Sequence, residues 1–245
     1  DTYYLGTMQM NLKISKYHKK QHKKIYRSTE LFIKFIEKYE KLNNKTILDL
    51  GCGAGANTIY LAKKYKNSNF IGIDRNLNAI KYAQNMVKKY KIKNCKFISG
   101  NILNLKKKPR IGKIDIAISF HFLSFVSEWY DITLGKICSL KPNSTAHSSL
   151  FFEGLAEAKI DVNDFSKSEL KKSPYNIFSL TKIKNFLIKK KYKFFRSKQM
   201  VIDKKIIKPR HKGMGSYTLK LRNGKLELRS GPLRLPHGFF YASKK

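Results

Sequence analysis

A chain of 245 residues has the length of one α/β domain, which needs roughly 150 to 250 residues, so we expect a single hydrophobic core. Apolar residues make up 42% of the sequence, enough to fill that core. The 52 basic residues outnumber the 16 acidic ones, which gives a formal net charge of +36. No run of about 18 uncharged apolar residues is present, so we expect no transmembrane segment.

Two explanations fit the positive charge. A positive field would concentrate a nucleic acid, an anionic membrane surface or a phosphorylated substrate. Alternatively, an AT-rich coding sequence would enrich Lys, Asn and Ile without any function for the charge. The basic clusters at 19–24, 106–108 and 189–191 are scattered, whereas a nucleic-acid site usually concentrates Arg and aromatic residues on one face. The scatter weakens the case for RNA and leaves both explanations open.

The three cysteines, Cys52, Cys95 and Cys138, are odd in number and widely spaced. They form no CxxC pair and no Cys/His cluster, so we expect reduced thiols rather than disulfides or a zinc site. The first residues also lack the basic start, apolar middle and cleavage site of a secretory signal. We therefore expect a cytoplasmic protein.

The expected elements begin with an N-terminal arm over residues 1–27, partly helical between 10 and 26. A helix follows from Ser28, the expected N-cap, and stops at Asn43 and Asn44. Strand 46–50 comes next, then a glycine-rich turn at 51–55 and a helix over 57–65. This unit of strand, tight turn and helix predicts a ligand site at the carboxyl end of its strand.

Strands and helices then alternate. We expect strands at 70–74, 95–101, 114–120 and 148–153, and helices at 77–90 and 128–140. Such alternation predicts a largely parallel sheet, because parallel neighbours need a crossover connection.

After Glu153 the expected order changes to a loop through Pro174, a helix over 179–192 and four strands at 193–202, 217–224, 225–231 and 237–244. The Asn-Gly-Lys turn at 223–225 predicts a β-hairpin. We expect no second domain, only a domain over 28–245 with an inserted hairpin at about 208–236.

Glycines at 51, 53 and 55 let a ligand approach the backbone where side chains would block it. The spacing of Gly51, Gly53 and Ala56 also satisfies the G-x-G-x-x-A dinucleotide fingerprint, so a dehydrogenase has to be considered. Asp74 ends the second strand, where a carboxylate can accept hydrogen bonds from ribose hydroxyls of either cofactor.

The segment Ile47 to Gly55, ILDLGCGAG, resembles the first motif of class I S-adenosylmethionine-dependent methyltransferases. In that motif an acidic residue, here Asp49, stands two positions before the GxGxG turn. The resemblance implies that the turn, with Gly51, Cys52, Gly53 and Gly55, approaches the methionine part of S-adenosyl-L-methionine. It also implies that Asp49 acts around the amino group of the cofactor.

The resemblance extends to about residue 153 and resumes in the last strands. It implies that Asp74 and Arg75 bind the ribose, that Asn101 and the Ile102 N–H face the adenine, and that Ser119 borders the cofactor. It further implies a seven-stranded Rossmann-like sheet, doubly wound and mostly parallel, with an antiparallel last strand. That ending, together with acidic or amide residues at successive strand ends, favours a methyltransferase over a dehydrogenase.

The end of the fourth strand indicates which acceptors to exclude. It lacks the Asn/Asp-Pro-Pro-aromatic pattern that the family's amino-methyltransferases of DNA and some RNA carry at this position. No cysteine follows a proline, as cytosine C5 methylation would need, and no carboxylates are present there to hold a metal. We therefore expect no metal ion.

Candidate residues for the acceptor side come from several places. His121 is the leading general base, because its ordinary pKa near 6.5 suits deprotonation, although it can equally pack on adenine or substrate. Glu153, at the end of the fifth strand, is a second base candidate. On the N-terminal arm, the expected substrate contacts are Tyr17 and His18, with His22 as a further part of a lid. In the C-terminal tail they are Arg210, Arg234 and His237, with His211 beside them. Arg210 and Arg234 can hold a phosphate by forked hydrogen bonds, but a solvated hairpin explains them equally well.

Three functions remain at this stage. The first is methyl transfer to an oxygen or nitrogen of a small anionic metabolite, such as a phosphorylated or nucleotide-linked sugar or precursor. The second is an RNA methyltransferase that uses the basic surface. The third is a cofactor-binding protein without catalysis.

Overall fold

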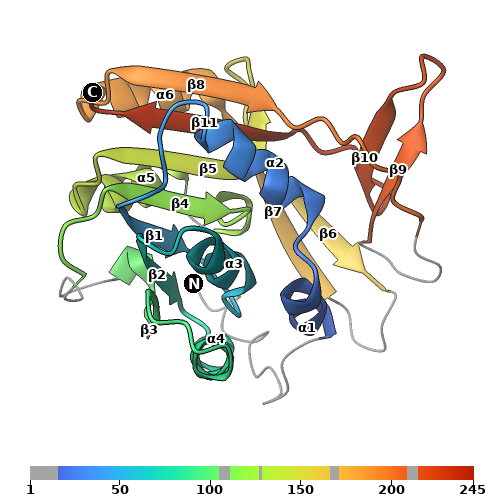
Figure 1. The fold of residues 1–245 in the computed structure, drawn as a ribbon. Helices are drawn as coiled ribbons and strands as arrows, with labels where there is room; N and C mark the ends of the chain where they lie inside the picture. Colours follow the sequence, from blue (N-terminus) through green and yellow to red (C-terminus); the bar gives the residue numbers. More distant parts are fainter. Residues whose placement is uncertain (1–15, 105–110, 127–128, 166–170, 209–214) are drawn as a thin grey trace.

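A seven-stranded path of one mixed sheet forms the centre of the fold (Figure 1). The computed structural model describes residues 16–104, 111–126, 129–165, 171–208 and 215–245. The order along the path is β3-β2-β1-β4-β5-β11-β8. Its strands are β1 Thr46–Leu50, β2 Asn69–Asp74, β3 Cys95–Ser99, β4 Ile116–Phe120, β5 Ser144–Phe152, β8 Phe194–Gln199 and β11 His237–Ser243.

The strand directions confirm the expected methyltransferase-type sheet. Strands β1 to β5 run parallel to one another, and β11 runs antiparallel to both β5 and β8. Parallel strands have to be covered on both faces, and the near-continuous apolar runs of β1, β2 and β4 meet that need. Their carboxyl ends lie at one edge, where the connections can build a site.

Helices cover both faces of the sheet. The described helices are α1 Lys16–Lys23, α2 Arg27–Ile36, α3 Ala56–Lys64, α4 Leu77–Lys89, α5 Tyr130–Ser139 and α6 Leu180–Lys189, with short 3-10 turns η1 Ile102–Asn104 and η2 Leu123–Phe125. Ile47 packs in one core cluster with α2, α3 and α4, whereas Leu48 packs in a second with α5 and α6. Because successive strand residues point to opposite faces, these clusters are the two sides of the sheet. None of the described helices is long and apolar enough to cross a membrane.

Helix α2 differs from its expected limits at both ends. It begins at Arg27 after an extended Tyr26, so Ser28 lies inside the helix and the N-cap prediction was wrong. The amides of Thr29 and Glu30 both donate to the Tyr26 carbonyl. The helix also ends at Ile36, well before Asn43, because the following residues form a turn that leads to buried Leu42.

The segment after β5 forms a β-hairpin, not the expected loop. Strand β6 Ala158–Asp164 pairs antiparallel with β7 Lys171–Ser179, and β7 pairs in parallel with the last two residues of β5. Pro174 misled the prediction, since a proline cannot donate to a central ladder. Here it lies opposite Asp161, where β7 has no described neighbour on its other side, so it occupies an edge position at which proline is tolerated.

The expected C-terminal hairpin is confirmed. Strands β9 Ser216–Lys220 and β10 Leu226–Ser230 form a separate antiparallel sheet that projects from the body beside β11 (Figure 1). Its tip is the turn through Asn223 and Gly224, and Gly224 has a φ of +76°. That left-handed conformation explains why a glycine stands at this turn.

Candidate active site

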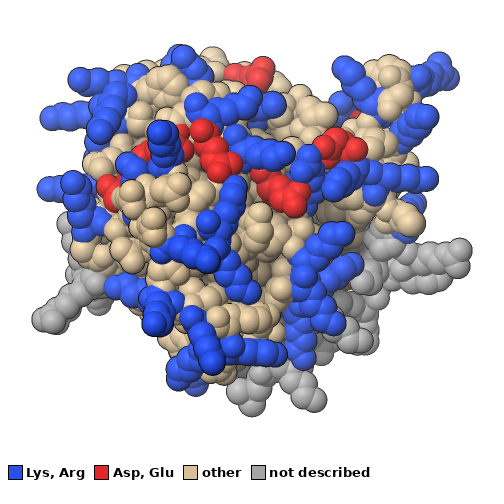
Figure 2. Space-filling model, viewed as in Figure 1, with Lys and Arg blue, Asp and Glu red and all other residues tan. Residues whose placement is uncertain are grey.

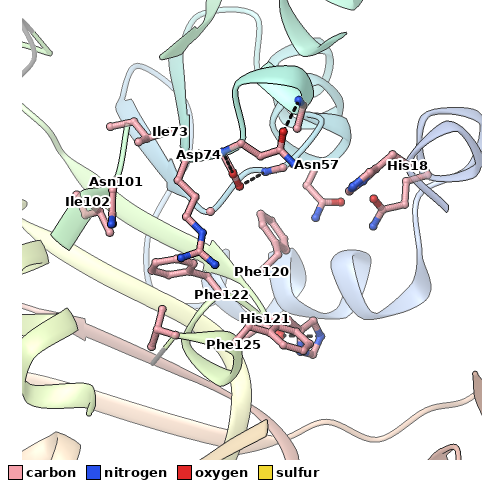
Figure 3. Close-up of a pocket in the computed structure, with 18 of the residues that line it drawn as sticks. His18, Asn57, Ile73, Asp74, Asn101, Ile102, Phe120, His121, Phe122 and Phe125 are labelled. Atoms are coloured by element: carbon pink, nitrogen blue, oxygen red, sulfur yellow. Dashed lines mark hydrogen bonds between the residues drawn. The ribbon is translucent and has the colours of Figure 1, made fainter. Parts of the chain in front are cut away.

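A cavity of about 430 Å³ lies at the carboxyl ends of the parallel strands (Figure 3). Its lining divides into two parts. The glycine side comes from the connections after β1, β2 and β3 and consists of Gly51, Gly53, Asp74, Arg75, Asn76 and residues 100–103. The aromatic side consists of Tyr26, Phe120, His121, Phe122, Phe125 and Val126, with Ser28, Thr29, Asn57 and Ser148 beside them.

The glycine turn is shaped by backbone that only glycine adopts easily. Gly51 has a φ of +66°, and a Cβ there would lie 2.3 Å from Cδ2 of Phe122. The amides of Gly51 and Cys52 both donate to the Ile73 carbonyl, at 2.8 and 3.1 Å, which ties the turn to the end of β2. The turn therefore offers a bare backbone surface to a ligand in the cavity.

Asp74 is held in place by two backbone donors. Its Oδ2 accepts from the Gly53 amide at 2.8 Å and its Oδ1 from the Asn76 amide at 2.8 Å. Each carboxylate oxygen has a further lone pair, so both can still accept from a ligand in the cavity. Arg75 beside it is exposed and also lines the cavity.

Asn101 and Ile102 lie at the end of β3 and line the same side. The Asn101 Oδ1 accepts from the Leu103 amide at 3.1 Å, which fixes the side chain, and Ile102 is buried. The structure thus places Asn101 near Asp74 around one cavity, as the sequence predicted for two successive strand ends (Figure 3).

Asp49 lies behind the cavity lining rather than on it. Its side chain is 1% exposed, and its Oδ2 accepts from the Thr58 hydroxyl at 2.6 Å. Oδ1 has no hydrogen-bond partner among the described residues. Burial raises the pKa of Asp49 to about 7, and the nearby carboxylate of Asp74 adds to this rise. Asp49 is thus a buried carboxyl under the turn with one oxygen that no described residue contacts.

Three other predicted cofactor contacts also stand behind the lining. Cys52 is half-buried, and its thiol faces the Gly53 carbonyl at 3.7 Å. Gly55 begins α3 at a φ of +77°. The buried Ser119 hydroxyl lies 2.7 Å from Nδ1 of His147, its register partner in β5, so both side chains lie on the same face of the sheet.

His121 is the central residue of the aromatic side. It adopts a φ of +58°, which is uncommon for a residue with a side chain. Its amide donates to the Ser148 carbonyl at 2.7 Å, and its Nε2 lies 3.4 Å from the Ser148 hydroxyl. Burial lowers the pKa of His121 to about 4, so the ring is neutral at neutral pH.

The fold brings His237 to His121. Their ring centroids are 5.3 Å apart at an edge-to-face angle of 79°. Both ring nitrogens of His237 are buried and have no hydrogen-bond partner among the described residues. Burial, together with the neighbouring His121, lowers the pKa of His237 to about 3. Two neutral imidazoles thus meet beside the cavity, from β4 and β11.

The other predicted acceptor-side residues have diverse positions. His18 lines the cavity near Gly53, and His22 donates to the Ala54 carbonyl at 2.7 Å, which holds α1 over the glycine turn. Glu153 is exposed and does not line the cavity. Arg234 is 67% exposed and pairs with Glu227 at 2.9 Å. The Tyr17 side chain, Arg210 and His211 lie outside the described residues.

Several lining residues were not predicted from the sequence. They include Tyr26, Asn57, Phe120, Phe125 and Ser148. For Phe120 and Phe125 the signal was the aromatic-rich run at 120–125, which is equally typical of a buried core. Tyr26, Asn57 and Ser148 had no such signal. Their convergence depends on packing between distant elements.

The residues present fit S-adenosylmethionine. A bare glycine turn, a carboxylate with free lone pairs and an amide at the next strand end match what the three parts of that molecule need. The geometry therefore agrees with the resemblance in the first motif.

A family described as "Methyltransferase domain" matches residues 41–196, which is more than half of the chain. The chain belongs to this family. The sheet order is that of the Rossmann-like methyltransferase fold, and the glycine turn and the strand-end residues border the cavity.

Two curated relatives show how different the acceptors of similar proteins are. A tRNA (guanine-N(7)-)-methyltransferase of Clostridium botulinum is 35% identical over 96 residues, 36% of this chain and 41% of its own length. An (S)-coclaurine N-methyltransferase of Papaver somniferum is 26% identical over 102 residues, 39% of this chain and 29% of its own length. Matches to three other curated relatives cover 20% to 43% of their lengths. These partial matches do not identify the acceptor.

A solved structure supports the fold over nearly the whole chain. The SAM-dependent methyltransferase of Aquifex aeolicus superimposes with a TM-score of 0.52 at 16% identity, over 95% of this chain and 100% of that one. The similarity at this identity concerns the fold, so the acceptor has to be argued from the cavity.

Proposed function

We propose that the protein transfers a methyl group to an oxygen or nitrogen of a small molecule that binds on the aromatic side of the cavity. The observation that carries this proposal is that the aromatic side adjoins the glycine side within one cavity of about 430 Å³. That volume lies in the range of about 300 to 1,000 Å³ found for small-molecule sites.

On the glycine side, we assign the ribose hydroxyls to Asp74 and the adenine to Asn101 and the Ile102 amide. The turn from Gly51 to Gly55, with Cys52, faces the methionine part, and Asp49 supports it from behind. Ser119 lies behind the lining, where its hydroxyl is 2.7 Å from Nδ1 of His147. S-adenosylmethionine, when bound, supplies a methyl group activated by a positively charged sulfur, so the protein has mainly to align the acceptor.

On the aromatic side, we assign His121 as the group that receives the acceptor's proton. Its ring is neutral at neutral pH, and its Nε2 is engaged only by a long contact of 3.4 Å to Ser148. An acceptor hydroxyl or amine can donate a hydrogen bond to this nitrogen, which both orients it and takes its proton as the new bond forms. The positive φ at His121 is the kind of local strain that persists where function requires it.

Arg75 indicates the charge of the acceptor. Arg75 is the cation among the described lining residues, and it lies on the glycine side. We propose that the acceptor directs an anionic group, such as a phosphate, toward Arg75 and solvent, and its reacting atom toward His121. Glu153 is too exposed to share the proton transfer in this arrangement, and Arg234 is already paired with Glu227.

The surface argues for a small molecule rather than RNA. Lys and Arg side chains spread over the whole face seen in Figure 2, and Asp and Glu side chains interrupt them across its middle. A nucleic-acid site usually gathers its cations into one patch or stripe. The basic surface is better suited to attracting anions in general than to holding one strand.

The test is transfer of label from methyl-labelled S-adenosylmethionine to a cell extract separated into small molecules, RNA and protein. We expect label in the small-molecule fraction and modest dependence on salt. Asp74→Ala, which removes the proposed ribose contact, serves as the inactive control. Label confined to RNA, with transfer that falls steeply as salt rises, would overturn the proposal.

A further inference from the structure

The β6–β7 hairpin starts where β5 leaves the main sheet. Strand β5 pairs with β11 up to Leu150, opposite His237, and its next two residues pair with Phe178 and Ser179 of β7. The pairing of the hairpin with β5 therefore begins at Phe151, one residue after Leu150, the register partner of His237. Its location, beside the aromatic side of the cavity, suggests a role in shaping that side.

Asn176 connects the hairpin to the cavity wall. The Nδ2 of Asn176 donates a hydrogen bond to the carbonyl of Val126, and Val126 lines the cavity. Asn176 is only 2% exposed, so loss of this bond would leave a buried carbonyl without a partner. An unpaired buried polar group is costly, so this hydrogen bond holds the hairpin firmly to the cavity wall.

Tyr175 makes the second connection. Its ring centroid lies 5.3 Å from that of Phe125, at an angle of 57°. Phe125 lines the cavity and is 47% exposed, so one part of its ring is free to contact a ligand. Tyr175 therefore packs against Phe125 from outside the cavity and helps to fix the position of its ring.

A third contact ties the other strand of the hairpin to the same region. The ammonium of Lys159, in β6, lies 4.4 Å above the ring of Trp129, which precedes α5. Both strands of the hairpin thus contact the connection between β4 and α5, which carries Phe122, Phe125 and Val126.

We infer that the β6–β7 hairpin determines which acceptors fit, and that the acceptor presents an apolar or aromatic ring to Phe125. Phe125 is the residue in contact with the acceptor, and Tyr175 and Asn176 are positioning residues that act through Phe125 and Val126. This inference rests on the proposed function, because it requires the acceptor to be a small molecule on the aromatic side.

The experiment compares Tyr175→Ala, Asn176→Asp and Phe125→Ala with the unchanged protein. Asn176→Asp keeps the shape of the side chain but replaces the donor with an oxygen. The matched controls are Phe165→Ala and Asn163→Asp, both at exposed positions of the same hairpin region. The probe is the small-molecule fraction that accepts label, and the measurement is the amount of it that gives half-maximal transfer. Binding of S-adenosylhomocysteine, measured by calorimetry, reports the glycine side independently.

We expect each of the three variants to need at least about five times more of the fraction for half-maximal transfer, in line with the loss of an aromatic pair or a buried hydrogen bond. We expect S-adenosylhomocysteine affinity and both controls to stay unchanged. If small molecules accept label and Phe125→Ala and Tyr175→Ala saturate like the unchanged protein, the inference is overturned and the proposed function stands. Label in RNA alone overturns the proposed function itself. Because Phe125 is half-exposed, its variant remains informative even if Asn176→Asp does not fold.

Discussion

The two sides of the cavity are built in different ways. The glycine side comes from three consecutive strand ends. Its key contacts are short hydrogen bonds donated by backbone amides, such as that from the Gly53 amide to the Asp74 carboxylate at 2.8 Å. The aromatic side is assembled from α1–α2, β4, η2, β5 and the neighbouring β11, and its contacts are between side chains, such as the His121–His237 ring pair. One side is thus fixed locally and the other depends on packing across the whole sheet.

This difference indicates which side of the cavity tolerates amino-acid substitutions. The glycine turn tolerates few, because a side chain at Gly51 would clash with Phe122. A wall of aromatic side chains can be reshaped by single substitutions without moving the strands. We therefore expect changes on the glycine side to abolish cofactor binding and changes on the aromatic side to alter turnover or acceptor use.

The largest expected effect is that of Gly51→Ala. The new Cβ would have both an unfavourable φ of +66° and a clash at 2.3 Å with Phe122, so we expect loss of measurable S-adenosylhomocysteine binding. We also expect a stability loss of about 2 to 4 kcal/mol. Calorimetry and chemical unfolding measure the two quantities. Gly224→Ala is the matched control, because it has a φ of +76° and open space around it. Equal losses in both variants would mean that φ alone, not the clash with Phe122, matters.

Asp74→Ala follows in size. Removal of the carboxylate takes away two acceptors for the proposed ribose contacts and frees the Gly53 and Asn76 amides. We expect S-adenosylhomocysteine affinity to fall about 100-fold, as for a charge-assisted bidentate contact. Asp161→Asn, an exposed change on β6, should bind like the unchanged protein. An affinity within twofold of normal for Asp74→Ala would remove the ribose assignment.

His121→Gln tests the aromatic side. We expect kcat to fall about 100-fold, the lower range for a general base, while S-adenosylhomocysteine affinity stays the same. His237→Gln should lower kcat less, because it acts beside His121. Full activity of His121→Gln would mean that the ring only packs against its ligand.

Three buried histidines, His121, His237 and His147, make the stability of the protein depend on pH. Burial lowers the pKa of His121 to about 4 and that of His237 to about 3, and it also lowers the pKa of His147 to about 3. The pKa values of these histidines in the folded protein lie below the value of 6.5 that they have in the unfolded chain. The stability that the neutral histidines contribute is therefore complete above pH 6.5 and is lost as the pH falls toward 4. Asp49, with its pKa raised to about 7, has the opposite effect: its contribution is complete below about 3.8 and is lost as the pH rises through 7.

With three histidines against one carboxyl, we expect the free energy of unfolding to fall between pH 6.5 and 4. Urea unfolding across this range measures it. His237→Gln should make the fall shallower, and Asp49→Asn should make it steeper. A free energy of unfolding that rises on acidification would show that Asp49 outweighs the histidines.

The smallest expected effect is that of Arg234→Gln. This exposed partner of Glu227 should contribute less than about 1 kcal/mol to stability. We also expect no change in transfer to small molecules, because the side chain does not line the cavity. A clear rise in the amount of acceptor needed would place the C-terminal hairpin in acceptor binding after all.

Much of the glycine side was predictable from single residues. Asp74 was predicted from its position at a strand end, and Asn101 from the resemblance to the family. A parallel sheet brings successive strand ends together by its geometry alone. The hairpin β6–β7 was not predictable, because Pro174 indicated a loop and its half-buried alternation of Ile160 and Val162 was too short to outweigh it. The pairing of His121 with His237 required knowing that β11 lies beside β5.

The sequence by itself determined the fold class and the position of the glycine turn, because these depend on short-range backbone requirements: left-handed glycines and the alternation of strands and helices. The cofactor followed from the resemblance of the first motif to a known family, since the turn alone also fits a dinucleotide. Only the tertiary structure decided which side chains share the cavity. It set Glu153 and Arg234 apart from the cavity, placed Asp49 behind the turn and brought His237 and the β6–β7 hairpin to the aromatic side. Such neighbours are fixed by the antiparallel return of β11 and by side-chain packing, and neither leaves a local pattern in the chain.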